Sequence, residues 1–96
     1  MDNIYIVTLY DYYGELLTDK QQKYFEDYYF LNLSLQEIAD DFKVSRNAVS
    51  KTILGINEKL EYYEEKLKLY QNGQKISKLL EKIEDEKIKK KIEELI

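Results

Sequence analysis

The chain has 96 residues and a mass of 11.6 kDa, enough for one small domain with a helical extension but not for two full cores. It contains neither cysteine nor histidine, which excludes disulfides, thiolate zinc sites and the usual general base. No apolar run approaches the roughly 20 residues of a membrane span, and the first residues lack the basic start of a signal peptide. We therefore expect a soluble cytoplasmic protein that is not an enzyme and that binds no metal, cofactor or small-molecule substrate.

Charge is distributed unevenly along the chain. Residues 1–44 carry nine acidic residues and three lysines, whereas residues 45–60 carry three basic residues and one acidic residue. Acidic and basic residues balance over residues 61–96. With a formal net charge of −4, the whole chain would be repelled by a polyanion, and its one basic window is short and central.

Apolar residues recur at three- and four-residue intervals and no alternating strand pattern is present, so we expect an all-α fold. The first helix is expected over residues 3–13, ending at Gly14. Thr18 and Ser34 each precede a helical segment and are followed three residues later by Gln or Glu, which is the arrangement of a capping box. The inward-facing residues of these two helices are expected to be Tyr24, Phe25, Tyr28 and Leu31 in one, and Leu35, Ile38, Ala39 and Phe42 in the other.

Ser45 is expected to cap a fourth, long helix. Apart from one glycine, no helix breaker follows it until the pair Asn72-Gly73. Further helices are expected from residue 74 onward, with a break near Glu84-Asp85. Two units result: a domain of residues 1–72 that includes the long helix, and a C-terminal helical tail of residues 73–96 that packs on this domain or on a partner.

The third and fourth helices are joined so tightly that they predict a helix-turn-helix. Ala39 is small enough for the two helices to approach closely, and Val44 is expected to fill the turn. Val49 and Ile53 are expected to hold the second helix of the motif against the first. In this motif the N-terminus of the second helix reaches base edges in the major groove, and Arg, Lys, Asn and Ser all suit bases or phosphates. The candidate nucleic-acid-binding residues are Ser45, Arg46, Asn47, Ser50 and Lys51.

The run Ser34-Leu35-Gln36-Glu37-Ile38-Ala39-Asp40-Asp41-Phe42-Lys43-Val44-Ser45-Arg46-Asn47-Ala48-Val49 resembles region four of bacterial sigma factors. Three more pieces make residues 4–72 similar to the YlxM family: Thr8-Leu9-Tyr10-Asp11-Tyr12-Tyr13, Leu16-Leu17-Thr18-Asp19-Lys20-Gln21 and Leu60-Glu61-Tyr62-Tyr63-Glu64-Glu65-Lys66-Leu67. The resemblance implies an all-helical helix-turn-helix protein with a regulatory or accessory role in the signal recognition particle pathway, and no catalytic residue or cofactor. After Ile53 this chain has Leu54 and Gly55 where the family pattern places basic residues, so we expect few phosphate contacts and weak, salt-sensitive duplex binding.

The expected long helix also carries a heptad seam, in which apolar residues alternate at steps of four and three. Beyond the motif the seam consists of Ile56, Leu60, Tyr63, Leu67 and Tyr70. One helix over residues 46–71 would be about 39 Å long, more than a three-helix core needs. The first helix and the tail could fold back along it, or two copies could dimerise through it, and both arrangements could share the seam. Gly55 marks either a close approach of another backbone or a bend.

Ten tyrosines and no tryptophan are present. Aromatic residues among basic ones can stack on single-stranded bases, but most of these tyrosines stand among acids. We therefore expect them in the core and at its margin, with their hydroxyl groups reaching water. In the tail, four lysines between residues 87 and 91 precede Glu93 and Glu94, which predicts a solvated helix face with internal salt bridges.

Three functions are compatible with these patterns. The preferred one is a regulatory or accessory helix-turn-helix protein of the signal recognition particle pathway that binds nucleic acid weakly. The alternatives are a sequence-specific DNA-binding transcriptional regulator, and a structural protein that dimerises through its long helix without binding nucleic acid. The candidate partners are accordingly DNA, the RNA or protein of the signal recognition particle, and a second copy of the chain.

Overall fold

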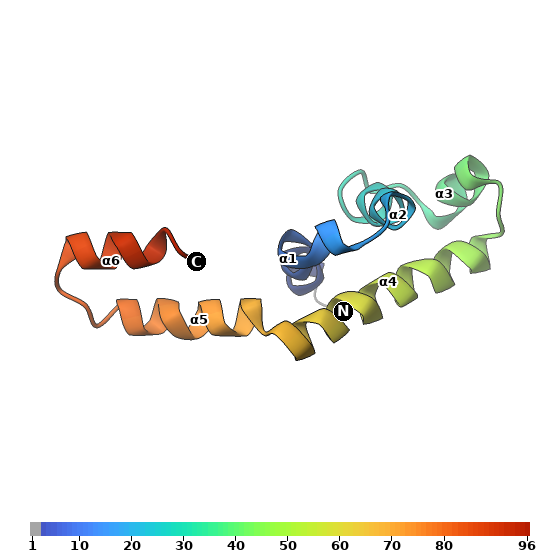
Figure 1. The fold of residues 1–96 in the computed structure, drawn as a ribbon. Coiled ribbons are helices and arrows are strands. Elements are labelled where there is room, and N and C mark those ends of the chain that lie inside the picture. The colour runs from blue at the N-terminus through green and yellow to red at the C-terminus, as the bar shows by residue number, and fades with distance from the viewer. Residues whose placement is uncertain (1–2) are drawn as a thin grey trace.

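In a computed structural model, which describes residues 3–96, the chain is all-α, and those residues contain no strand. The elements are α1 (Asn3–Tyr13), the short 3-10 helix η1 (Gly14–Leu16), α2 (Asp19–Tyr29), α3 (Leu35–Phe42), α4 (Arg46–Leu67), α5 (Leu69–Leu80) and α6 (Glu86–Glu93). Figure 1 shows α4 running beneath α1, α2 and α3, with α5 continuing beyond them and α6 turning back beside α5. The all-α prediction is confirmed.

Helices α2, α3 and α4 begin where their predicted caps stand. Thr18 and Gln21 exchange two hydrogen bonds of 3.0 and 3.1 Å, and Ser34 and Glu37 exchange two of 3.0 Å, so both capping boxes are complete. Ser45 Oγ accepts a hydrogen bond of 3.1 Å from the amide three residues on. These caps satisfy amide groups that the first turn of a helix leaves without a partner.

The core is built on one face of α4. Its buried residues are Ile6, Leu9, Tyr13, Leu17, Tyr24, Phe25, Ile38, Ala39, Val49, Ile53, Ile56 and Leu60. The last four belong to α4, which packs against α1, α2 and α3. The first half of the predicted seam is therefore covered by helices of the same chain, and burial of each such side chain contributes about 1.5–3 kcal/mol.

The second half of the seam differs from expectation, because α4 ends at Leu67. Lys68 adopts a left-handed conformation with φ 55°, and α5 starts at the next residue. The predicted break at Asn72-Gly73 is wrong, since both residues lie inside α5. Tyr70 is consequently on a different helix from the rest of the seam, and Leu67 is half-exposed.

The break is explained by the carboxylate of Glu64, which is buried in the last turn of α4. Its oxygens accept hydrogen bonds from the Tyr13 hydroxyl (2.6 Å) and from the amides of Tyr70 and Gln71 (3.1 Å each). The Tyr13 hydroxyl in turn accepts a hydrogen bond from the Leu69 amide at 3.0 Å. A side chain of α4 thus caps α5, with its negative charge at the positive end of the α5 dipole.

Two glycines of the second half of the chain have opposite surroundings. A Cβ atom on Gly73 would lie 3.2 Å from Ile96 Cγ2 and 3.3 Å from the Tyr12 hydroxyl, so α5 passes close to other groups there. A Cβ atom on Gly55 would have no neighbour within 4 Å. Within the described chain the close approach is therefore at Gly73 and not at Gly55.

The tail extends the molecule instead of folding back along α4. The described chain measures 55 × 25 × 23 Å, with a radius of gyration of 17.1 Å. A compact domain of this length would have a radius of about 12–13 Å. Of the two segments that could have covered α4, α1 does so, whereas α5 contacts α1 and α4 and continues beyond the end of α4.

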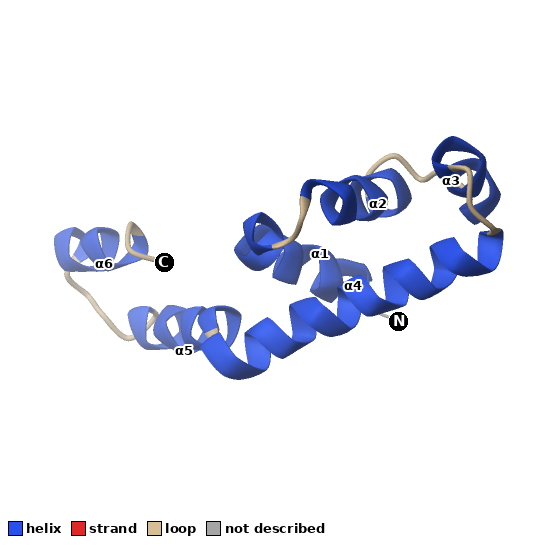
Figure 2. Ribbon diagram, turned by 45° about the vertical axis from the view of Figure 1, so that its right-hand side comes forward, coloured by secondary structure: helices blue, strands red, loops and turns tan. Residues whose placement is uncertain are grey.

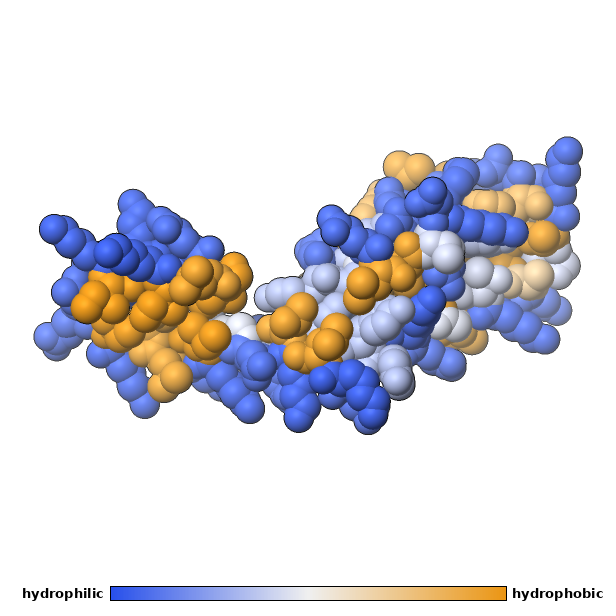
Figure 3. Space-filling view, viewed as in Figure 1, coloured by the Kyte–Doolittle hydropathy of each residue, from blue (hydrophilic) through white to orange (hydrophobic). Residues whose placement is uncertain are grey.

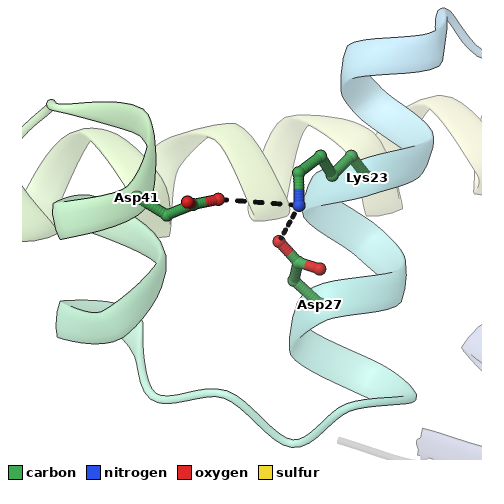
Figure 4. A network of polar contacts seen from close by, with 3 residues as sticks. All are labelled: Lys23, Asp27 and Asp41. Carbon is green, nitrogen blue, oxygen red and sulfur yellow. Dashed lines mark hydrogen bonds and ion pairs between the residues drawn. The ribbon is translucent and has the colours of Figure 1, made fainter.

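A three-residue polar network joins α2 to α3 (Figure 4). Lys23 Nζ lies 3.1 Å from an oxygen of the buried Asp27 and 3.5 Å from an oxygen of Asp41. The hydrogen bond to Asp27 raises the pKa of Lys23. The ammonium group of Lys23 is therefore already paired with acidic side chains of the same chain.

The tyrosines lie mostly in the core and at its margin, as predicted. Tyr13 and Tyr24 are buried, whereas Tyr12 and Tyr62 are exposed. The partly buried ones are Tyr5, Tyr10, Tyr28, Tyr29, Tyr63 and Tyr70. The Tyr10 hydroxyl donates a hydrogen bond to Glu26.

Two smaller expectations are wrong. Leu31 follows the end of α2 and is 64% exposed, so it is not on the inward face of that helix. The tail lysines also form no salt bridge with Glu93 or Glu94. Among residues 3–96 the only ion pairs are the two made by Lys23.

Replacing Glu64 with alanine is expected to lower the free energy of unfolding by about 2–3 kcal/mol, because three donors lose a buried, charged acceptor. Urea unfolding followed by circular dichroism measures the change. Hydrogen exchange should show reduced protection of the Tyr70 and Gln71 amides. The neighbouring exposed Glu65→Ala is the control and should change stability by less than about 0.5 kcal/mol. Equal effects of the two substitutions would contradict the capping role.

Stability is expected to fall at strongly alkaline pH. Burial, followed by the hydrogen bond to a carboxylate, raises the pKa of both Tyr10 and Tyr13 above the ordinary value of 10. The unfolded chain then loses tyrosine protons from about pH 10 upward while the folded chain keeps them, so the free energy of unfolding decreases as pH rises. Urea unfolding between neutral pH and pH about 11 measures this decrease. It should be smaller in Tyr13→Phe than in the unmodified chain.

Candidate nucleic-acid interface

A sharp turn of three residues connects α3 to α4 (Figure 2). Lys43 closes α3 in a left-handed conformation with φ 59°, and the Val44 amide donates a hydrogen bond of 3.0 Å to the Ala39 carbonyl. These features reverse the chain in the manner of a helix C-cap, after which Ser45 caps α4. The predicted bend between the two helices is present.

The turn is packed differently from the prediction. Val44 is 40% exposed and does not fill the turn. Instead, the Phe42 ring stacks on Tyr24 of α2, with centroids 4.0 Å apart and planes 10° apart. The stacked rings pack α3 onto α2, and Val44 lies at the surface.

Burial of Val49 and Ile53 turns the opposite side of α4 to solvent. Among the predicted binding residues, four are exposed and one, Ser50, is partly buried. The four exposed residues are Ser45, Arg46, Asn47 and Lys51. All five lie in the cap and the first two turns of α4, so the structure brings them together at one end of the helix.

The N-terminus of α4 also offers backbone donors. The Ser45 side chain accepts from the Ala48 amide, which leaves the amides of Arg46 and Asn47 without a partner in the helix. Such amides and the positive end of the helix dipole favour a phosphate oxygen. Within residues 3–96, neither Arg46 nor Lys51 forms an ion pair. Both charges are therefore available to a ligand.

Lys43 is a further candidate that sequence reasoning missed. It stands in the turn and is exposed, immediately before the α4 cap. Counting charge by segments had assigned it to the acidic first 44 residues. Lys43 lies beside the basic residues of α4 because of the geometry of the turn. The sequence offered one signal of this position, since Lys43 stands only three residues before Arg46.

The neighbouring helix α3 limits this interface. It exposes Glu37, Asp40 and Asp41. Asp41 is partly neutralised by Lys23, and Asp40 accepts a hydrogen bond of 2.8 Å from Gln36. A polyanion approaching the α4 terminus would still meet repulsion from the α3 side.

Ser50 faces a different environment from the exposed four. It lines a groove of about 180 Å³ whose described walls carry no charged side chain. The lining residues are Asn3, Tyr28, Tyr29, Leu35, Ser50, Ile53, Leu54 and Asn57. In this groove the Asn57 amide donates a 2.8 Å hydrogen bond to the Tyr29 hydroxyl. A larger hollow of about 410 Å³ lies along α2 and is lined by three acidic residues and one lysine, which does not suit a phosphate.

Two further properties concern residues 3–96. No group of three or more acidic side chains in this part of the chain is arranged to hold a metal ion. None of its helices is both long enough and apolar enough to cross a membrane.

The profile of the UPF0122 family, described as "Putative helix-turn-helix protein, YlxM / p13 like", matches residues 1–96. A UPF0122 protein of Caldanaerobacter subterraneus subsp. tengcongensis is 43% identical over 84 residues, which cover 88% of this chain and 72% of the relative. A UPF0122 protein of Oceanobacillus iheyensis is 51% identical over 75 residues, covering 78% of this chain and 71% of the relative. One from Listeria innocua serovar 6a is 42% identical over 96 aligned residues, covering 91% and 87%. The chain therefore belongs to the UPF0122 family of YlxM/p13-like helix-turn-helix proteins.

Proposed function

We propose that this cytoplasmic protein is a regulatory or accessory factor that binds nucleic acid weakly through the N-terminus of α4. The observation that carries the proposal is the exposed, unpaired cluster of Lys43, Arg46, Asn47 and Lys51 beside free backbone amides. The resemblance to YlxM proteins supports the signal recognition particle pathway as the setting. We assign the protein no enzymatic activity, since it offers no histidine or cysteine beside its serines.

The number of basic side chains sets the strength of binding. Three contacts to duplex phosphates give a slope of about −2.7 in the logarithm of affinity against the logarithm of salt concentration. Raising the salt fourfold then weakens binding about 40-fold, far less than the 10³- to 10⁵-fold of a protein with six to ten such contacts. This modest electrostatic contribution favours a partner that is held by other contacts as well.

A sequence-specific DNA-binding regulator is the second candidate. Arg46 and Asn47 are side chains that can contact guanine and adenine edges, and both are exposed in the first turn of α4. The two candidates differ in what binding depends on: base sequence for the regulator, and the identity of the RNA or protein for the accessory factor.

Titration of labelled duplex DNA and of signal recognition particle RNA at two salt concentrations tests the interface. Arg46→Ala and Lys51→Ala are each expected to weaken binding and to reduce the salt slope by about 1, because each removes one phosphate contact. Lys66→Ala, at the far end of α4, is the control and should bind like the unmodified chain. If both interface variants bind DNA and RNA normally, the proposed interface is wrong.

The Lys43→Gly substitution distinguishes an effect on nucleic-acid binding from an effect on the stability of the fold. Glycine adopts the left-handed conformation of residue 43 without strain, whereas a side chain there costs roughly 1 kcal/mol. We therefore expect unchanged or higher stability in urea unfolding together with weaker nucleic-acid binding. Lys51→Gly, inside the helix, should instead lose about 1 kcal/mol of stability. A Lys43→Gly variant that is clearly destabilised, or that binds normally, would contradict this assignment.

A further inference from the structure

The α5–α6 hairpin carries an apolar surface that no other helix covers. Its exposed apolar side chains, 37–86% accessible, are Leu69, Ile76, Leu79, Ile88, Leu95 and Ile96. Only Leu80 and Gly73 are buried in these two helices. Figure 3 shows the surface as a continuous apolar patch on the part of the molecule that projects from the core. Patches of this kind usually mark an interface.

The apolar positions of the hairpin, buried and exposed together, recur at the intervals of a helix bundle. Along α5 and the turn after it, Gly73, Ile76, Leu80 and Ile83 follow at steps of three, four and three. Along α6 and its end, Ile88, Ile92 and Leu95 follow at steps of four and three. Helices of 12 and 8 residues are marginal when paired only with each other. Two such hairpins facing one another complete the usual four-helix arrangement.

The composition of the patch indicates what covers it. All thirteen aromatic residues of the chain lie between residues 5 and 70, and the tail contains no methionine or arginine. Aromatic residues, methionine and arginine are enriched where different proteins meet. A purely aliphatic surface instead resembles the core of a permanent homodimer.

The charge of the tail also favours a second copy of the chain as the partner that covers the patch. Residues 73–96 contain seven lysines and six acidic residues, a formal net charge of +1, whereas residues 1–72 carry −5. Within residues 3–96 none of these tail lysines forms an ion pair. Two tails, each with a net charge of only +1, can therefore meet with little net repulsion and with unpaired charges of both signs at the rim, whereas the acidic domains repel each other more strongly.

We propose that two copies of the chain dimerise by packing their α5–α6 hairpins into a four-helix bundle. The bundle covers the aliphatic patch on both copies and leaves the N-terminus of each α4 at the outer ends of the assembly. This dimer differs from one formed along the α4 seam, whose first half is already covered within each copy. It does not require nucleic acid.

Sedimentation equilibrium of the full chain tests the proposal. The expected mass is about 23 kDa, twice the 11.6 kDa of the chain. Ile88→Lys and Leu79→Lys are expected to give the monomer mass. Leu54→Lys and Leu67→Lys are the matched controls, since both residues are 49% exposed and lie on α4, against 51% for Ile88. Both controls should stay dimeric.

Thiol labelling gives a second measurement that does not depend on a disruptive substitution. Because the chain has no cysteine, Ile88→Cys introduces a single thiol into the patch. Its alkylation should become several-fold slower as protein concentration rises from nanomolar to high micromolar, whereas alkylation of Leu54→Cys should not change.

Three results would overturn the proposal. One is a monomer mass for the unmodified chain at high micromolar concentration, as expected if the patch serves another protein. Another is a dimer that Leu67→Lys dissociates but Ile88→Lys does not, which would assign the interface to α4. The third is an Ile88→Cys variant whose thiol stays equally reactive at all concentrations. None of these results bears on nucleic-acid binding by α4.

Discussion

Burial of one face of α4 is the constraint on which the other features depend. Val49, Ile53, Ile56 and Leu60 are covered by the three preceding helices, and this packing fixes how α4 is rotated about its axis. Successive residues of a helix are about 100° apart, so the residues between the buried ones must face solvent. Arg46, Asn47 and Lys51 are exposed for this reason and not because of any interaction of their own.

The two ends of α4 are held by different forces. At its N-terminus the cap of Ser45 and the apolar contacts of the motif define a rigid bend. At its C-terminus the link to α5 depends on the buried Glu64 carboxylate and the Tyr13 hydroxyl, with four hydrogen bonds among these two groups and the start of α5. Hydrogen bonds are directional whereas apolar burial is not, so this link specifies an angle between two helices without requiring a large contact area.

Much of the fold was readable from the sequence, because it is encoded locally. The caps at Thr18, Ser34 and Ser45 and the apolar spacing in α1 to α4 depend on residues within a few positions of one another, and the structure confirms them. The five candidate binding residues lie together at one end of a helix, as their spacing in the sequence indicates. The membership in the YlxM-like family follows from four short pieces in a fixed order.

What the sequence did not reveal depends on contacts between distant residues. The end of α4 requires Tyr13 to meet Glu64, 51 positions later, and it places a lysine in a conformation usually left to glycine. Val44 is exposed, and the contact that packs α3 onto α2 is the stacking of Phe42 on Tyr24, across two helices. The missing salt bridges of the tail show that a favourable spacing on a helix does not fix the geometry of long, solvated side chains.

The backbone at Lys68 has a consequence for any symmetric assembly of this chain. Helix α5 follows α4 directly after Lys68, so the torsion angles of this residue, together with the hydrogen bonds of Glu64 and Tyr13, orient the arm formed by α5 and α6 in a molecule that is 55 Å long. In a pair joined by their tails, a small rotation at this residue is amplified by the length of the arm into a large displacement of the far end. The distance between the two helix ends proposed to bind phosphate, and hence the spacing of sites that one pair could occupy together, would be adjusted at residue 68 without any change to the proposed binding residues.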